Sequence, residues 1–460
     1  MEPRDRTLGL VTALLPIGLF LVVYGIHAGH GFMQDDYTWV LHSRSRSLAD
    51  LGRLFVRDNG FYRPVVSMSF AVNEWLFGAA PLGYGLTNVA LALGCAGAIV
   101  GLARAFELPR GAAWLAGVLW LMNFYFTKTA ILWISGRTAL ILTVLGVLAA
   151  TALVRHHLKT ALLLLTLALL AKEEAVLLPF VLTAWLVVRP SRPDERRPPV
   201  APWIVGSAAV LLGYLAARSF TSAMTPFTAP AYYRFTFHPL AVLRNVFEYA
   251  DRSSTLALVV TLVGAATLGS SKVRLEPVTR RAILCGAIWL VAGLGFAYIL
   301  PVRSDLYAAM PAVGSSLIAA AVGASLWQPA TTPRRRRALA AAIAASVALQ
   351  PVYWLRTQRM VHVAEFSASR LDELERLTRG LAPRAFVQVD DVETNDPHTP
   401  NLAAAFGAAI NDAYALRAGR SLDLVLVDPT ARALNPTNRV PDLHLALRDG
   451  RLQIAGRPGS

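Results

Sequence analysis

The 460-residue sequence has few charged residues and very few cysteines. Charged residues make up 16% of the chain, whereas hydrophobic residues make up 55% and the mean hydropathy is +0.47. A soluble domain of this length needs a larger polar fraction to cover its surface, so the composition excludes one. The two cysteines, Cys95 and Cys285, both lie inside apolar segments. This excludes a disulfide framework and a cysteine-based zinc site.

Acidic residues are also scarce relative to basic ones, which gives a formal net charge of +15. The basic residues gather in short tracts that fall between alternate pairs of apolar runs: RPSRPDERR from Arg189, SSKVR and TRR around Ser271, and PRRRR from Pro333, together with Arg4, Arg6, Arg104, Arg110, Arg155 and Lys159. This spacing follows the positive-inside rule rather than the pattern of a nucleic-acid-binding surface. We therefore predict a cytoplasmic N-terminus and no nucleic-acid partner.

Apolar runs long enough to cross a hydrocarbon core of about 30 Å recur up to residue 355. We predict about eleven transmembrane helices, at residues 8–28, 85–105, 111–127, 129–153, 158–171, 174–188, 202–219, 254–270, 281–299, 306–327 and 338–355. The first run is longer than a signal-peptide core and lacks a small-x-small cleavage site, so we interpret it as a retained anchor. The apolar runs stop at residue 355, so we predict a membrane domain, 1–355, and a second domain, 356–460. An odd number of spans places this second domain on the extracytoplasmic side.

Two hairpins are short for membrane spans. Residues 158–188 must cross and return in about thirty residues, although two standard spans need about twenty each. The interrupting Lys172-Glu173-Glu174 is therefore predicted to lie in a recess, and the turn between Asn123 and Arg137 resembles it. Charges below the lipid surface need partners or a ligand. The long outer loops, 29–84 and 220–253, have the mixed composition of amphipathic helices at the membrane interface.

Topology assigns ten charged residues to the outer face: Asp35, Asp36, Arg63, Lys128, Arg137, Lys172, Glu173, Glu174, Arg303 and Asp305. One chemistry that needs such a set is transfer from a lipid phosphate, in which a carboxylate takes a proton from an acceptor hydroxyl and cations hold the departing phosphate. Each residue also has a purely structural interpretation, which the sequence leaves open. These are a turn and helix cap for the Asp pair, a helix start for Arg63-Pro64, an internally neutralised turn for residues 172–174, and a cap and headgroup contact for Asp305 and Arg303.

Five blocks occur together in one order: QDDYTWV at 34–40, NGFYRPVVSMSF at 59–70, WISGRTALI at 133–141, AKEEAVLLP at 171–179 and RSDLYAAMPAVG at 303–314. In these blocks the sequence resembles the GT-C class of multi-pass glycosyltransferases, particularly the protein O-mannosyltransferase-like and transmembrane-and-tetratricopeptide mannosyltransferase branch. The resemblance covers most of residues 30–315. It implies a polyprenyl-phosphate-linked sugar as donor and an acidic residue of the first outer loop as the base of an inverting transfer.

The resemblance assigns the catalytic role to Asp35 or Asp36. We favour Asp35 as the base and Asp36 as its orienting or metal-contacting neighbour, and adjacent like charges raise one of the two pKa values. Some GT-C enzymes use a divalent metal such as Mg or Mn, but the first outer loop has no convincing DxD motif or histidine cluster.

The resemblance also implies residues that hold the donor. The candidates for the lipid phosphate are Arg63, Arg137, Lys172 and Arg303. Arg303 ranks last, because relatives often have an ER pair followed by YLP where this chain has RSDLYA. Glu173 or Glu174 would keep Lys172 charged or contact sugar hydroxyls, and Tyr62 would contact the sugar or acceptor or support the site.

The last hundred residues predict a small α/β domain. An amphipathic helix around Glu365 to Leu381 precedes two short strands and the hairpin LHLALRDGRLQIAG, in which Asp449-Gly450 suits a type I′ turn. Three acidic residues, Asp390, Asp391 and Asp428, follow strands and are common loop residues there. The tail has no tetratricopeptide periodicity.

Other functions remain open at this stage: a transporter or flippase, a non-catalytic scaffold, or a ligase or polymerase of polyprenyl-diphosphate-linked glycans. A transporter should show two corresponding halves, which the sequence lacks. The acceptor could be a protein, a glycan or a lipid. The abundance of Arg and Ala over Lys is typical of GC-rich bacteria, which points to a bacterial inner membrane.

Overall fold

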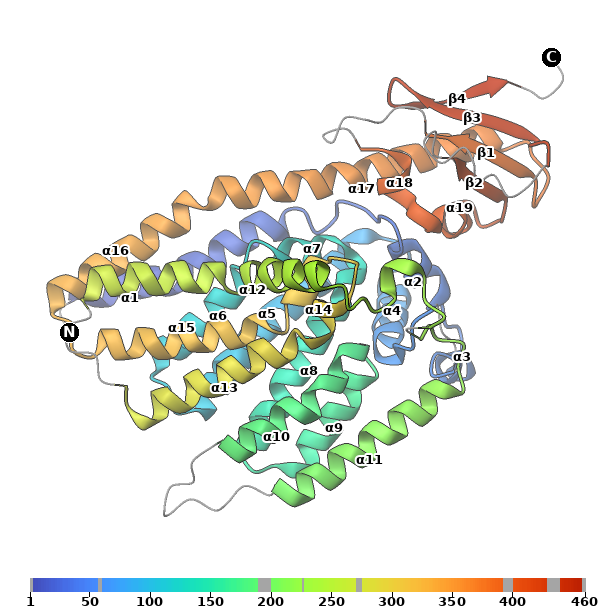
Figure 1. The fold of residues 1–460 in the computed structure, drawn as a ribbon. Helices are drawn as coiled ribbons and strands as arrows, with labels where there is room; N and C mark the ends of the chain where they lie inside the picture. The colour runs from blue at the N-terminus through green and yellow to red at the C-terminus, as the bar shows by residue number, and fades with distance from the viewer. Residues whose placement is uncertain are drawn as a thin grey trace.

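The computed structural model describes residues 3–56, 60–188, 200–225, 227–269, 275–391, 400–427 and 439–456. The basic tract at Arg189, most of that around Ser271, and Asp428 lie outside these ranges. Each predicted span overlaps helix in the bundle (Figure 1), whose helices are α1 (Pro3–Phe20), α5 (Pro81–Ala105), α6 (Arg110–Leu121), α7 (Phe126–Leu132), α8 (Arg137–Val154), α9 (Leu158–Leu169), α10 (Leu178–Val188), α11 (Val200–Ser219), α12 (Pro239–Leu268), α13 (Pro277–Gly293), α14 (Gly295–Ile299), α15 (Ala312–Trp327) and α16 (Thr332–Ala348).

Within the described ranges, five helical stretches are long and apolar enough to cross a membrane: Pro81–Ala105, Ile134–Val154, Val200–Ser219, Pro277–Ile299 and Thr332–Thr378. A sixth forms if α6 and α7, which are bent by 67° at their junction, count as one span. Three shorter apolar helices, Gly9–Gly25, Leu158–Leu169 and Ala312–Trp327, lie beside them. The predicted fold class, an α-helical polytopic membrane protein with a small α/β region, is confirmed.

The predicted short hairpin consists of α9 and α10, which are joined by a 3₁₀ turn, Glu173–Leu177. The twelve residues of α9 rise only about 18 Å, less than the hydrocarbon thickness of a bilayer. The turn that carries the charges is therefore held below the level reached by longer helices. The bend between α6 and α7 is fixed by Asn123, whose side-chain oxygen accepts the N–H of Tyr125 at 3.0 Å.

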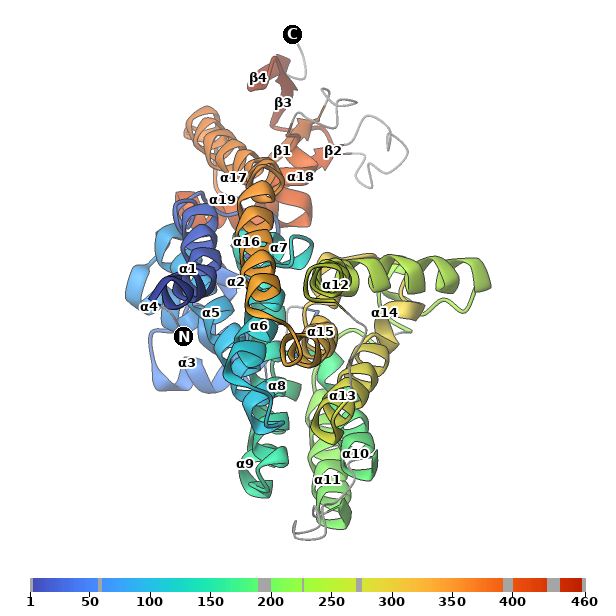
Figure 2. The ribbon, with the colours of Figure 1, turned by 90° about the vertical axis from the view of Figure 1, so that its left-hand side faces the viewer.

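The outer loops contain short helices, as their composition predicts. The first loop forms α2 (Asp36–His42), α3 (Leu48–Arg53) and α4 (Pro64–Phe77), and the second contains a 3₁₀ turn, Ala231–Tyr233. Helix α12 starts 15 residues before the span predicted at 254–270. Its first half projects sideways from the bundle, as Figure 2 shows.

The C-terminal region forms a four-stranded sheet in the order β2-β1-β3-β4, from β1 (Phe386–Asp390), β2 (Asp423–Val427), β3 (Leu443–Arg448) and β4 (Arg451–Gly456). β1 pairs in parallel with β2 and β3, whereas β3 and β4 form the predicted antiparallel hairpin. Asp449 and Gly450 both have positive φ, 48° and 68°, as a type I′ turn requires. Helices α17 (Gln350–Thr378), α18 (Leu402–Phe406) and α19 (Ile410–Ala418) pack beside the sheet.

Helix α17 links the two parts of the molecule. It runs without a break across the boundary predicted after residue 355, and it extends the predicted amphipathic helix by 15 residues toward its N-terminus. The N-terminus and the start of α16, which carries the PRRRR tract, lie at the end of the bundle opposite the α/β domain (Figure 1). One hydrophobic cluster joins residues of the first outer loop to those of the sheet.

Candidate functional site

Asp35 and Asp36 lie at the start of α2, but their side chains have different surroundings. Asp35 is the N-cap residue and is partly exposed, whereas Asp36 is fully buried. The Oδ2 atom of Asp36 accepts the backbone N–H groups of Met33 at 3.0 Å and Ile134 at 3.4 Å. Its Oδ1 atom accepts the N–H of Ser135 at 2.7 Å. Both oxygens of Asp36 therefore hold two loops together, and Asp35 is the more open carboxylate.

The Ser135 hydroxyl bridges the two carboxylates. Its Oγ lies 2.6 Å from Asp35 Oδ1 and 2.7 Å from Asp36 Oδ1. A hydroxyl has one proton and can donate to only one of them, so the second link needs a proton on a carboxyl group. Burial raises the pKa of both, and burial together with the charge of Asp35 raises the pKa of Asp36 to about 7. The pair therefore keeps one proton at a pH where an exposed aspartate is ionised.

Arg63 forms a bidentate ion pair with Glu173. Its Nε and Nη2 donate to the two carboxylate oxygens at 2.9 Å and 2.6 Å, and its guanidinium lies over the Phe61 ring, 4.0 Å from the centroid. Burial opposes both charges, but their attraction is larger: the pKa of Arg63 rises and that of Glu173 falls to about 2. The charge of Arg63 also lowers the pKa of Asp35. The charge of Arg63 therefore acts on two carboxylates, those of Glu173 and Asp35.

The predicted recess contains Lys172 and Glu174, which are only 4% and 6% exposed. Their side chains form an ion pair of 2.5 Å, and the Lys172 ammonium lies 4.9 Å from the centre of the Tyr307 ring. Of the two glutamates considered for Lys172, Glu174 is its partner, because Glu173 is taken by Arg63. The burial of this turn agrees with the prediction made from hairpin length.

Arg137 does not face an open site, contrary to its selection as a phosphate ligand. Its side chain is fully buried and donates to Asn88 Oδ1 at 3.0 Å, Asn73 Oδ1 at 2.5 Å and the carbonyl of Tyr84 at 3.2 Å. The guanidinium also lies 4.2 Å from the centre of the Phe70 ring. A guanidinium enclosed by these acceptors connects α4, α5 and α8, and its N–H groups are directed at protein oxygens rather than at an open site.

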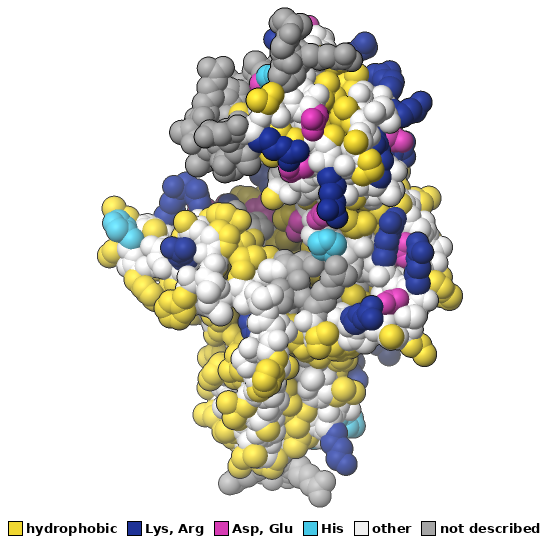
Figure 3. Space-filling model, turned by 90° about the vertical axis from the view of Figure 1, so that its right-hand side faces the viewer, with side chains coloured by type: hydrophobic (Ala, Val, Ile, Leu, Met, Phe, Trp, Pro, Cys, Tyr) yellow, Lys and Arg dark blue, Asp and Glu magenta, His cyan; other side chains and the backbone are white. Residues whose placement is uncertain are grey.

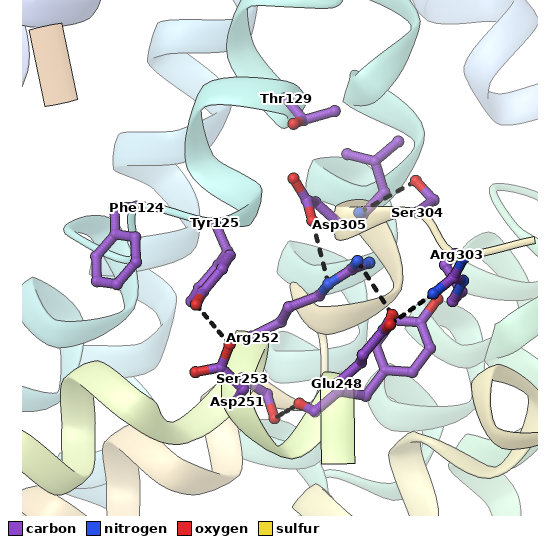
Figure 4. Close-up of polar contacts among 12 residues, drawn as sticks. Phe124, Tyr125, Thr129, Glu248, Asp251, Arg252, Ser253, Arg303, Ser304 and Asp305 are labelled. Carbon is purple, nitrogen blue, oxygen red and sulfur yellow. Dashed lines mark hydrogen bonds and ion pairs between the residues drawn. The ribbon is translucent and has the colours of Figure 1, made fainter. Parts of the chain in front are cut away.

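A second charged group connects α7, α12 and the segment before α15. Asp305 accepts Lys128 of α7 at 2.9 Å. Figure 4 shows the rest of the group: Asp305 lies 3.4 Å from Arg252, and Glu248 lies 3.4 Å from Arg252 and 2.6 Å from Arg303. The side chain of Arg303 is 34% exposed, so it is at the rim of this group. Asp305 is thus an ion-pair partner rather than the helix cap that the sequence also allowed.

Ser304 supplies that cap instead, since its hydroxyl accepts the N–H of Leu306. Tyr62, considered as a sugar contact, is only 4% exposed and packs against Tyr214 with ring centres 6.1 Å apart. Its position fits support of the site rather than contact with a substrate.

A metal role for Asp36 does not fit its surroundings, because backbone N–H groups occupy both of its oxygens. Over the described part of the chain, no group of three or more His, Cys, Asp or Glu side chains is arranged to hold a metal ion. We therefore derive no step through a metal.

Sequence reasoning missed four residues that complete these groups: Ser135, Glu248, Arg252 and Tyr307. Two of them lie inside the quoted blocks, Ser135 in WISGRTALI and Tyr307 in RSDLYAAMPAVG. The other two lie four residues apart in the second outer loop, a spacing that places them on one helix face. That spacing was a usable signal, although it could not identify Asp305 as the shared partner.

The end of the molecule that carries the α/β domain is hollowed between that domain and the projecting half of α12 (Figure 3). Acidic side chains are visible inside the hollow, and Lys and Arg side chains gather on the surfaces around and above it. The lower part of the same face is mainly hydrophobic, as a lipid-facing surface would be.

No protein-family model matches the chain, and a search of curated proteins finds no match. Solved structures similar to it include two of ArnT from Cupriavidus metallidurans: the crystal structure bound to undecaprenyl phosphate, with a TM-score of 0.55, and that of the apo state, with a TM-score of 0.57. The identity is 14% in each comparison, which covers 95% of this chain and 93% of ArnT. Similarity over nearly the whole of both chains shows that this protein has the GT-C fold of ArnT.

Proposed function

We propose that the protein is a membrane glycosyltransferase that moves a sugar from a polyprenyl-phosphate-linked donor to an acceptor hydroxyl, with inversion at the anomeric carbon. The observation that carries the proposal is the partly exposed carboxylate of Asp35, which the Ser135 hydroxyl contacts at 2.6 Å and on which the charge of Arg63 acts. The similarity to ArnT, which was crystallised with undecaprenyl phosphate, supports a polyprenyl-phosphate donor.

In this proposal Asp35 is the general base. Its carboxylate takes the proton of the acceptor hydroxyl as the acceptor oxygen attacks the anomeric carbon. The bond between that carbon and the donor phosphate breaks, and the phosphate leaves with one additional negative charge. Asp36 holds the loop, and Ser135 keeps the two carboxylates in contact.

Arg63 and Lys172 are the proposed phosphate ligands. Glu173 uses two of the five N–H groups of the Arg63 guanidinium, and planar guanidinium groups suit phosphate oxygens. Lys172 would act as a point charge from the recess. Arg303 could contribute at the rim, whereas the enclosed Arg137 is not part of this set.

The proposed orientation follows the basic tracts. The N-terminus would be cytoplasmic, the α/β domain extracytoplasmic, and the site open to the outer leaflet of a bacterial inner membrane. The mannosyltransferase-like blocks make polyprenyl-phosphate-linked hexoses the first donors to test. The acceptor hydroxyl could belong to a protein, a glycan or a lipid.

Transfer of radiolabelled sugar in proteoliposomes, with wild type and Asp35→Asn, tests the proposal. The donors are a panel of polyprenyl-monophosphate sugars and, for comparison, polyprenyl-diphosphate-linked glycans. The lipid fraction of a wild-type extract serves as acceptor in one arm, and peptides and glycans serve in the others. We expect transfer by wild type and none by the variant. Transfer only from polyprenyl-diphosphate-linked glycans would instead favour the ligase or polymerase class.

A further inference from the structure

The α/β domain makes direct polar contacts with the loop that carries the Asp pair. Gln34 donates its backbone N–H to the carbonyl of Ala405 at 2.7 Å and its side-chain amide to the carbonyl of Ala404 at 3.1 Å. One turn further along α2, the Thr38 hydroxyl donates to Asp412 Oδ2 at 2.6 Å. These contacts connect α2, and Gln34 two residues before it, to α18 and α19, which are about 370 residues away in the chain.

Gln34 has an unusual backbone conformation for a residue with a side chain. Its φ is +51°, in the left-handed region that Cβ contacts disfavour. The two carbonyls of α18 satisfy both its N–H and its side chain in this conformation, so they help to select it. Asp35 is the next residue. The direction in which the chain enters α2, and hence the direction of the Asp35 side chain, depends on this turn.

Apolar contacts surround the polar ones on the same side of α2. Tyr37 lies 6.1 Å from Phe406 between ring centres, and its hydroxyl is 2.7 Å from Ser367 Oγ of α17. Tyr37 and Trp39 belong to the same buried cluster as Phe406 and Ile410. The α/β domain therefore forms one wall of the core in which α2 is embedded, rather than an independent appendage.

We propose that the C-terminal α/β domain fixes the catalytic loop, and that Gln34 is a positioning residue that sets the orientation of Asp35. This inference rests on the proposed function, because it concerns the geometry of the same base. Displacement of a catalytic base by as little as about 1 Å can lower the rate on the order of 100-fold. The domain would thus contribute to turnover without touching the substrate.

Substitutions at Gln34 can separate the effect of its backbone conformation and amide group from the effect of its side-chain size. Gln34→Val removes the side-chain bond and disfavours positive φ, because Val is β-branched. Gln34→Asn keeps an amide and tolerates positive φ better than most residues. We expect Gln34→Val to lower kcat by about 10- to 100-fold with donor KM changed less than about twofold, and Gln34→Asn to recover most of the loss. The matched control is Asp423→Asn, which breaks the exposed pair with Arg439 in the same domain.

Two measurements keep the inference distinct from the proposed function. Hydrogen exchange of the amides of residues 32–42 reports the order of the loop without any substrate, and it should speed up in Gln34→Val but not in Asp423→Asn. If wild type transfers no sugar, the proposed function fails and this exchange still decides whether the α/β domain orders the loop. Wild-type kcat and exchange in Gln34→Val would overturn the inference, as would equal losses of kcat in Gln34→Val and Gln34→Asn.

Discussion

Replacing each member of the aspartate pair by asparagine should separate turnover from stability. Asp35→Asn keeps the size of the side chain and a carbonyl oxygen that still accepts from Ser135, so we expect this variant to fold and to lose transfer. Asp36→Asn puts an NH₂ group where one of two buried oxygens accepts backbone N–H groups. We expect this second variant to lose stability first, and activity as a consequence.

The magnitudes follow from the contacts of the two carboxylates. In one orientation the new NH₂ group at position 36 would face the N–H groups of Met33 and Ile134, and in the other the N–H of Ser135. Each buried N–H left without an acceptor costs about 1–3 kcal/mol, so the better orientation should cost about that amount of unfolding free energy. Asp35→Asn should cost no more than about 1 kcal/mol, the value of one hydrogen bond. Loss of a general base should lower kcat by about 10²–10⁴.

The chain supplies its own reporter for the stability measurement. Cys95 and Cys285 form no disulfide and both are buried, so a thiol-reactive fluorophore detects unfolding during a temperature ramp of the purified protein. Transfer is measured on the same preparations below the lower melting temperature. Wild-type turnover in Asp35→Asn would show that Asp35 is not the base. Equal melting temperatures of the two variants would refute the anchoring role assigned to Asp36.

Three further expectations concern neighbouring residues. Desolvation raises the pKa of Asp35, and a protonated base is inactive. A pH–rate profile should therefore show kcat falling as the pH drops through an apparent pKa above the ordinary aspartate value of about 3.9. A fall centred at or below that value would contradict the raised pKa of Asp35. Arg63→Gln should raise the donor KM by about 10- to 100-fold, because it removes one charge-assisted hydrogen bond worth about 1.5–3 kcal/mol, and Arg63→Lys should raise it less. Initial rates measured against donor concentration give this KM, and an unchanged value would exclude Arg63 from phosphate binding. Arg137→Gln should lower the melting temperature and leave the donor KM of the folded fraction unchanged, whereas a selective rise in that KM would restore Arg137 as a ligand.

Chain length and hydrophobic pattern were sufficient to predict much of the fold. The hairpin at 158–188 has too few residues for two full spans, and this alone placed Lys172 and Glu174 in a recess. Alternating apolar residues around Asp449-Gly450 likewise predicted the β3–β4 hairpin. Both inferences depend on local sequence, so neither required knowledge of a distant contact.

The partners of the charges could not be predicted in the same way. Arg63 and Arg137 both lie among apolar residues near the ends of helices, yet one meets a carboxylate and the other two neutral amides, Asn73 and Asn88. Which partner is available depends on how α4, α5 and α8 pack. The sequence of each arginine's own helix does not contain that information.

The two aspartates show the same limit at shorter range. Neighbouring positions on a helix point about 100° apart, so α2 must turn one carboxylate inward and leave the other more open. The apolar pattern of α2 is too short to decide which. The decision comes from the loop at Ile134 and Ser135, whose N–H groups need an acceptor, and from the α/β domain, which packs on α2 from the other side.

The charge balance of the proposed transfer explains why cations and carboxylates are paired at this site. Before transfer, Asp35 and the donor phosphodiester carry one negative charge each; afterwards Asp35 is neutral and the polyprenyl phosphate carries two. The total is unchanged, and the charge moves from the base to the phosphate. Arg63 acts on Asp35 and is held by Glu173, so a single fixed guanidinium can balance both ends of this shift without moving. Restoring the starting state then requires loss of the Asp35 proton, which makes the raised pKa of the pair a determinant of turnover.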